Sequence, residues 1–196
     1  MLIDPIEKEL KKLQEENSRL KILSEVDGLT GLYNRLAGER LINDRLHKNA
    51  GGNFMVVDVD GFKKINDQYG HLFGDDVLRG LAALMKEIFG GENLVGRFGG
   101  DEFVIFTVKE WDAGKAIEKG KELIRRMEAM GRKMGVKDRF SATIGLSAYQ
   151  DKDTYSSMFS RADFALMQGK KSGKSAVYYY RELHNESRPV AAAESK

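Results

Sequence analysis

The chain has 196 residues, 41% hydrophobic and 32% charged, a composition that supports one folded domain with appendages and excludes disorder of the whole. Lys and Arg number 32 against 30 Asp and Glu, a balance that does not indicate nucleic-acid binding. The absence of cysteine excludes disulfides, thiolate catalysis and zinc–cysteine sites. No apolar stretch reaches the ~20 residues of a membrane span, and no secretory leader opens the chain. A cytoplasmic protein without a membrane segment is therefore expected.

Residues 1–26 are rich in Lys, Glu and Leu, and their apolar residues recur in alternating steps of three and four, as in a heptad seam. The seam consists of Ile3, Ile6, Leu10, Leu13, Asn17 and Leu20. An Asn at position a, here Asn17, favours a parallel two-stranded coiled coil because it pairs best with its twin. We therefore expect a dimerisation helix over 1–26 and a parallel homodimer. The alternative is an amphipathic helix packed on its own domain, since about three heptads are marginal alone.

Residues 27–180 are expected to form the globular domain, and the polar tail 181–196 to be disordered. Apolar patterning predicts helices near 35–47, 62–67, 75–89, 113–134 and 155–171. It predicts strands near 54–57, 94–98, 102–108, 140–148 and 176–179. This order contains a β-α-β-β-α-β unit, so the expected fold is α+β and ferredoxin-like, an antiparallel sheet with helices on one face.

Acidic residues gather at two places that such a sheet would bring to one edge. Asp58 and Asp60 end a buried strand two residues apart, so their side chains share one face. Asp101 and Glu102 follow a Gly-Gly turn between two strands. If the strands are neighbours, Asp58, Asp101 and Glu102 converge, and close carboxylates repel one another unless a cation neutralises them. With no Cys and only three His, the expected ion is Mg²⁺. Taken singly, each acidic pair is equally typical of an ordinary surface.

The block Gly99-Gly100-Asp101-Glu102-Phe103 matches the signature of GGDEF domains, the diguanylate cyclases that make cyclic di-GMP from GTP. The segments 27–35, 58–67, 70–75 and 162–173 also resemble this family. The similarity covers roughly Asp27 to Tyr179. It implies a palm-like fold in which two GTP molecules condense to cyclic di-GMP and release two pyrophosphates. Because one site holds one GTP, two domains must face each other, and paired N-terminal helices would promote that encounter.

The resemblance also assigns roles to residues of the site. Two Mg²⁺ or Mn²⁺ ions per active site would be held by Asp58, the Val59 carbonyl, Asp101 and Glu102. Glu102 would also help to deprotonate the attacking 3′-hydroxyl. Phosphates would be bound by Gly61, Phe62, Lys63, Lys170 and Lys174. Arg97 would stabilise phosphate charge on the facing nucleotide.

Guanine recognition would fall to Asn66 and Asp75. A carboxylate accepts hydrogen bonds from guanine N1–H and the 2-amino group, and adenine offers neither, so Asp75 favours GTP over ATP. Both residues could instead be helix caps, because Asp75 lies where a helix is expected to begin.

Several positions depart from the family pattern. The Arg-x-x-Asp motif of product inhibition is replaced by Gly90-Gly91-Glu92-Asn93, so no product-inhibition site is expected. Lys174 stands where Arg is frequent and offers a point charge in place of a bidentate fork. Met167, Gly169 and Ser175 replace Tyr, Ala and Asn.

Three other functions fit parts of the sequence. The chain could be a module that holds GTP or a partner without turnover, a cyclase of altered nucleotide specificity, or a coiled-coil scaffold with an inert globular part. The intact set of Asp58, Asp101 and Glu102 disfavours the first, and Asp75 disfavours the second. The family pattern also allows an upstream sensor domain.

Overall fold

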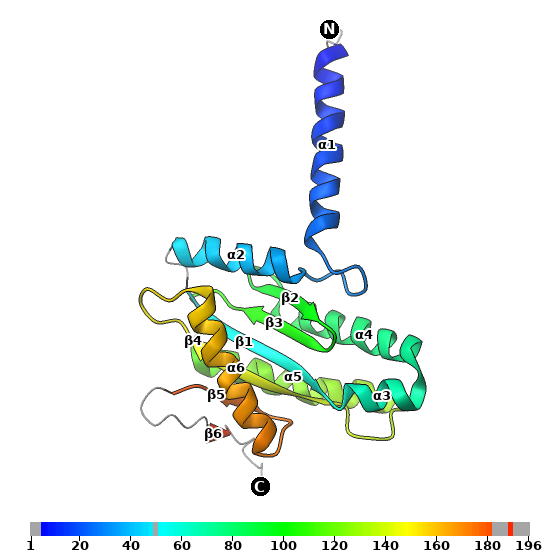
Figure 1. The fold of residues 1–196 in the computed structure, drawn as a ribbon, viewed down its shortest axis with the longest axis vertical. Coiled ribbons are helices and arrows are strands. Elements are labelled where there is room, and N and C mark those ends of the chain that lie inside the picture. Colours follow the sequence, from blue (N-terminus) through cyan, green and yellow to red (C-terminus); the bar gives the residue numbers. More distant parts are fainter. Residues whose placement is uncertain (1–4, 49–50, 182–187, 190–196) are drawn as a thin grey trace.

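The computed structural model describes residues 5–48, 51–181 and 188–189. A long N-terminal helix projects from a globular body in which helices cover a central sheet (Figure 1). The helices are α1 (Pro5–Glu25), α2 (Arg35–His47), α3 (Phe62–Tyr69), α4 (His71–Phe89), α5 (Ala113–Lys133) and α6 (Tyr155–Lys171). The strands are β1 (Asn53–Asp60), β2 (Leu94–Gly99), β3 (Glu102–Phe106), β4 (Ser141–Ala148), β5 (Val177–Tyr179) and β6 (Arg188–Pro189).

The sheet has the strand order β2-β3-β1-β4-β5-β6. The first four strands of this order pair antiparallel, with β1 between β3 and β4. This confirms the predicted α+β class and its ferredoxin-like unit. β5 pairs with β4 in parallel, so the sheet is mixed, and the wholly antiparallel sheet expected from the sequence is wrong in this respect. The chain after α6 turns back along the sheet and adds β5 in the direction of β4.

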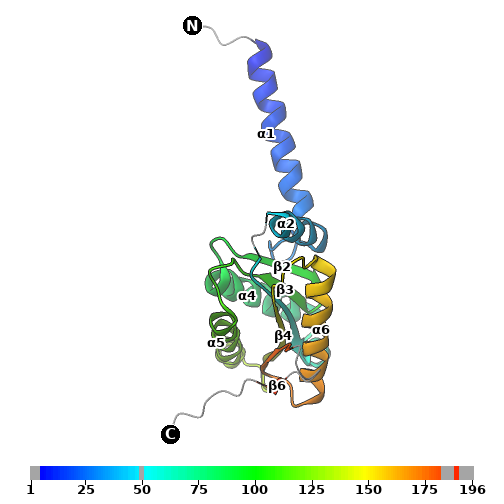
Figure 2. The ribbon, with the colours of Figure 1, turned by 90° about the vertical axis from the view of Figure 1, so that its left-hand side faces the viewer.

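Helices cover both faces of the sheet, whereas the sequence predicted one (Figure 2). The alternation of side chains along β1 gives the reason. Met55 and Val57 belong to the core beneath α4 and α5, while Phe54 and Val56 belong to the core beneath α2 and α6. All four are buried, and a strand that is apolar on both sides needs cover on both sides.

Three helices begin at polar side chains that cap them. Asn34, Asp112 and Thr154 precede α2, α5 and α6, and each accepts a hydrogen bond from a backbone N–H three residues on. α4 instead begins at His71 behind Gly70, four residues earlier than predicted. Asp75 therefore lies inside α4 and Asn66 inside α3. This removes the alternative that these two residues are helix caps.

The loop after α1 closes the outer edge of the sheet. Tyr33 forms a bridge to Gly96 of β2. Its N–H donates to the Val95 carbonyl at 3.2 Å, and its carbonyl accepts from the Arg97 N–H at 2.8 Å. The polar groups on the free side of β2 are therefore partly satisfied by this loop.

The structure describes only part of the predicted N-terminal helix and of the C-terminal tail. α1 stands away from the body (Figure 2), and its seam residues Leu10 and Leu13 are 55% and 54% exposed, so these two side chains do not pack on their own domain. The side chains of the other seam residues, Ile3, Ile6, Asn17 and Leu20, lie outside what the structure describes. Of the tail 181–196, the described residues are Arg181 and the pair Arg188–Pro189, which forms β6 on β5; the expected disorder of the tail stays a prediction. Among the helices of the described chain, none has the length and apolar character that crossing a bilayer requires.

Candidate active site

The predicted acidic residues lie where β1 ends and β3 begins. Asp58 of β1 and Glu102 of β3 are register partners, and Asp101 lies in the turn before Glu102. The Val59 N–H donates to the Asp101 carbonyl at 3.3 Å, which fixes the turn to β1. Asp58 is 9% exposed, Asp101 is half-buried and Glu102 is exposed. The hairpin thus places acidic side chains beside the buried end of the central strand.

Charge repulsion between Asp58 and Asp101 makes this edge a candidate cation site. Burial, and then the negative charge of Asp58, raise the pKa of the Asp101 carboxyl above its ordinary value, while Lys170 and Arg97 act to lower it. The Lys170 ammonium reaches from α6 and lies 2.7 Å from Asp58 Oδ2. Two close carboxylates beside the Val59 backbone form a hard oxygen donor set, which fits Mg²⁺ or Mn²⁺.

The three-carboxylate convergence expected from the sequence differs from what the structure shows. Across the described ranges, no group of three or more His, Cys, Asp or Glu side chains is arranged to hold a metal ion. Asp58 and Asp101 come together, but the exposed Glu102 does not join them in such a group. Repulsion gives the reason, since a third carboxylate gains by staying in water while Lys170 and Arg97 already face two carboxylates.

Arg97 is held by the protein itself. Its Nη1 lies 3.0 Å and 3.2 Å from the carboxylate oxygens of Asp27. Its Nε and Nη2 donate to the Gly100 carbonyl at 3.0 Å and 2.8 Å, and its side chain is 13% exposed. These contacts tie the turn at Gly100 to the loop after α1, and they favour a positioning role for Arg97 over the phosphate contact predicted from the sequence.

Asp27 was not singled out by the sequence as a site residue, because its partner Arg97 lies 70 positions away. Burial acts to raise the pKa of Asp27, but hydrogen bonds from Thr30 and Arg97 outweigh it and hold this pKa below its ordinary value. The carboxylate is therefore stabilised in its charged form.

Replacement of Asp27 by Asn should lower the free energy of unfolding by about 1–2 kcal/mol at neutral pH, because Arg97 loses a charged partner that is only partly screened. The contribution of a group whose folded pKa is lowered is present above its unfolded pKa and is lost as pH falls through the folded pKa. Denaturant unfolding of wild type and Asp27→Asn should thus converge below about pH 4. A constant difference between pH 7 and pH 3 would contradict this account.

The expected guanine contacts flank a tight junction between α3 and α4. Asn66 Oδ1 is buried and has no hydrogen-bond partner within the described residues. A Cβ added at Gly74 would lie 1.9 Å from that oxygen, so only glycine leaves room for the Asn66 side chain. Asp75 follows Gly74 and is half-buried. An orphaned buried amide oxygen costs free energy, and it suits a site that a ligand completes.

The expected phosphate-binding residues surround the end of β1. Gly61, with φ of 73°, leads β1 into α3, and the amide groups of the first helical turn give that end a partial positive charge. Phe62 and Lys63 form this turn, Lys63 being exposed. Gly61 and Lys174 line one surface pocket of about 250 Å³. Lys170 lies outside the lining of this pocket, in contact with Asp58. The cationic groups therefore border the acidic edge.

Two departures from the family pattern have a structural setting. A Cβ at Gly169 would lie 2.3 Å from the Tyr178 ring and 2.8 Å from Thr143 Cγ2, so glycine permits close packing of α6 on the sheet. Met167 is 51% exposed and lies outside the core.

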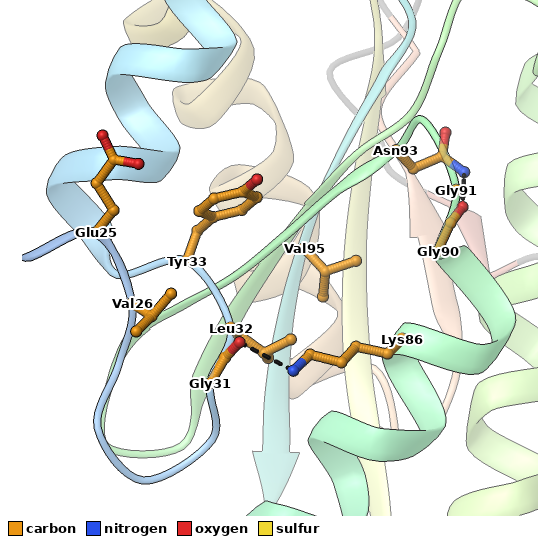
Figure 3. Close-up of a pocket in the computed structure, with 10 residues that line it drawn as sticks. All are labelled: Glu25, Val26, Gly31, Leu32, Tyr33, Lys86, Gly90, Gly91, Asn93 and Val95. Atoms are coloured by element: carbon orange, nitrogen blue, oxygen red, sulfur yellow. Dashed lines mark hydrogen bonds between the residues drawn. The ribbon is translucent and has the colours of Figure 1, made fainter. Parts of the chain in front are cut away.

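Residues 90–93, whose sequence departs from Arg-x-x-Asp, border a separate pocket of about 380 Å³ (Figure 3). Gly90, Gly91 and Asn93 line it on one side and the loop around Gly31 on the other. Lys86 crosses it and donates to the Gly31 carbonyl at 2.9 Å. The pocket lies away from the acidic edge, and its lining holds neither the Arg nor the Asp of that motif.

A palm-like α+β domain with two close acidic side chains at the end of its central strand is the class that these observations define. Residues 24–176 match the diguanylate cyclase GGDEF-domain family, and the chain belongs to that family.

Individual relatives agree with this assignment. The chain is 33% identical over 172 residues to the diguanylate cyclase DgcP of Pseudomonas aeruginosa, an alignment that covers 81% of this chain and 24% of the relative. It spans between 24% and 51% of the length of three curated relatives that it matches. The coiled coil and GGDEF domain of DgcB from Caulobacter crescentus, solved with c-di-GMP, has a TM-score of 0.77 and 24% identity, covering 88% of this chain and 94% of that one.

A second solved structure is the diguanylate cyclase SiaD of Pseudomonas aeruginosa in complex with its activator SiaC. It has a TM-score of 0.68 and 29% identity, with coverage of 88% of this chain and 68% of that one.

Proposed function

We propose that this chain condenses two GTP molecules into cyclic di-GMP and two pyrophosphates at the interface of a homodimer. The observation that carries the proposal is the pairing of Asp58 with Asp101 at the end of β1, with Lys170 at 2.7 Å from Asp58. The intact family signature and the match over residues 24–176 support the same reaction.

In this proposal Asp58, the Val59 carbonyl and Asp101 hold two Mg²⁺ or Mn²⁺ ions, and Glu102 completes the set when nucleotide is present. Bound ions of this kind lower the pKa of an attacking hydroxyl and stabilise charge on the phosphoryl group. Lys170 then exchanges its contact with Asp58 for the phosphates. Arg97 acts by holding the Gly100 turn through its contacts with Asp27 and the Gly100 carbonyl.

In this proposal the phosphates bind at the first turn of α3, and guanine binds further along that helix. The phosphate ligands are Gly61, Phe62 and Lys63 of this turn, together with Lys170 and Lys174. Asn66 and Asp75 bind guanine, with Gly74 providing the space that Asn66 occupies. An Asp that is left unpaired by adenine makes the site selective for GTP.

Mass analysis of products after incubation with GTP, ATP and Mg²⁺ tests the reaction directly. We expect cyclic di-GMP from GTP, and no cyclic product from ATP. Binding of GTP without pyrophosphate release would identify a binding module instead. Mixed or adenine-containing cyclic dinucleotides would contradict the role of Asp75.

The exposed seam of α1 supports a parallel dimer formed through that helix. Leu10 and Leu13 present apolar surface to solvent, which a second copy of the helix would cover. The dimer would bring two GTP-loaded domains together, with product inhibition through the Arg-x-x-Asp motif absent. A cytoplasmic location and control by an upstream sensor or activator partner complete the proposal.

A shortened chain that begins at Ser24 should lose at least about ten-fold in turnover at low protein concentration, because the linked helix raises the effective concentration of the second domain. Raising the concentration of the shortened chain should restore activity, which also shows that the domain is folded. Full turnover of the shortened chain at low concentration would refute the role of α1.

A further inference from the structure

The turn after α6 has a backbone conformation that needs support. Gly173, Lys174 and Ser175 have φ values of 123°, 61° and 50°. Left-handed backbone is disfavoured for Lys and Ser because Cβ approaches the following carbonyl oxygen. Such residues persist where surrounding contacts determine them. Since Lys174 is an expected phosphate ligand, whatever fixes this turn also places a binding side chain.

Side chains of β1 and β4 fix the turn. The Ser175 N–H donates to Asp60 Oδ2 at 3.1 Å and to Thr143 Oγ1 at 3.2 Å. The Thr143 hydroxyl donates to Asp60 Oδ1 at 2.8 Å. The hydroxyls of Ser141 and Ser175 also form a hydrogen bond. Both carboxylate oxygens of Asp60 are thus engaged with the turn or with the hydroxyl that supports it.

The same turn brings Lys174 to the end of β1. Lys174 lines the pocket of about 250 Å³ together with Asp60, Gly61, Lys64 and Asp138. Gly61 is the N-terminal cap of α3, where phosphate binding is expected. Asp60 therefore connects the strand that carries Asp58 to the turn that carries Lys174.

We propose that Asp60 is a positioning residue that holds the Gly173–Ser175 turn in its left-handed conformation and so directs Lys174 at the phosphates of GTP. The inference rests on the proposed function. A purely electrostatic role would predict the opposite change in GTP affinity. A carboxylate in this pocket repels phosphate, so its removal would tighten GTP binding. Loss of GTP affinity on removal of the charge therefore identifies a geometric role.

Steady-state kinetics of Asp60→Asn test whether GTP affinity falls or rises when the Asp60 charge is removed. The variant should raise KM for GTP about five-fold or more while kcat stays within about two-fold of wild type. The matched control is Asp138→Asn, which removes an exposed carboxylate from the same pocket and should leave KM unchanged or lower. A KM of Asp60→Asn at or below that of wild type would overturn the proposal.

Coupling to Lys174 is tested by a double-mutant cycle. In a Lys174→Ala background, Asp60→Asn should raise KM no further, because its effect passes through Lys174. Independent, additive effects would overturn the proposal. Ser175→Asn should recover part of the affinity lost in Asp60→Asn, since Asn tolerates the left-handed conformation better than Ser.

The hydrogen bonds from the Ser175 N–H to Asp60 and Thr143 form a clamp on the turn. Hydrogen exchange of the Ser175 amide tests this clamp without any turnover. Exchange should be faster in Asp60→Asn and in Thr143→Val than in wild type, and unchanged exchange in both would count against the proposal. Thr143→Val carries the test if Asp60→Asn does not fold. If wild type forms no product while Asp60 still protects the Ser175 amide, the proposed function fails and the clamp stands.

Discussion

Asp101→Asn is expected to reduce cyclic di-GMP formation by at least about 1000-fold, because it removes a charged oxygen donor from the proposed cation site. The same variant should be as stable as wild type or more stable. Burial and the neighbouring Asp58 raise the pKa of Asp101, so the folded state disfavours the charged carboxylate and a neutral amide relieves that repulsion. Loss of activity with retained or increased thermal stability would show that Asp101 serves catalysis rather than stability.

Product formation and thermal unfolding of Asp101→Asn should be measured side by side with Glu92→Gln, an exposed neighbour of the hairpin that should alter neither. Titration with Mn²⁺ should show weaker binding by Asp101→Asn. Asp101→Ala and Glu102→Ala should likewise lose synthesis while they remain folded. Wild-type-like synthesis by any of the three would refute the assigned metal chemistry.

Gly74→Ala is expected to raise KM for GTP by about ten-fold or more, the cost of one displaced hydrogen-bonding group. The added Cβ would lie 1.9 Å from Asn66 Oδ1, so the Asn66 amide must leave its position although no atom of Gly74 is expected to touch GTP. Asn66→Ala should have a similar effect, and the two substitutions together should not be additive.

The matched control lies on the same helix. In Gly80→Ala the added Cβ meets the sulfur of Met130 at 2.8 Å, a flexible group that can move, so KM should stay within about two-fold of wild type. Inosine triphosphate provides a second readout, because it lacks the 2-amino group, a donor whose hydrogen bond Asn66 Oδ1, unpartnered within the described residues, can accept beside Asp75. Gly74→Ala should discriminate less between GTP and this analogue, and unchanged discrimination would separate Gly74 from guanine recognition.

Local signals in the sequence predicted most of the elements and the approach of Asp101 to Asp58, but not the exposed position of Glu102. The Gly-Gly turn predicted the β2–β3 hairpin, and the apolar run Phe54–Val57 predicted β1. The helix predicted near 113–134 is α5, and the Asp112 side chain caps its start. Asp58 and Asp60 share one sheet face as their spacing indicates, since both face residues of the α6 side. These features depend on a few neighbouring residues, so a single sequence carries them.

Features that depend on distant pairs were missed. The contact of Asp27 with Arg97 and that of Asp60 with Ser175 join residues far apart in the chain. The early start of α4 was missed because Gly70 provides no side-chain cap. The second helical layer was missed because the short apolar run of β1 does not tell how many faces are covered.

The backbone contact of Tyr33 with β2 has a practical consequence for shortened forms of the protein. Removing the loop that carries it would leave β2 with a bare row of amide and carbonyl groups, a template for edge-to-edge aggregation. The segment after α1 thus covers the edge strand β2 and also connects α1 to the globular domain. Trimming should stop before Asp27, so that the effect of losing α1 is not confused with self-association of an exposed sheet edge.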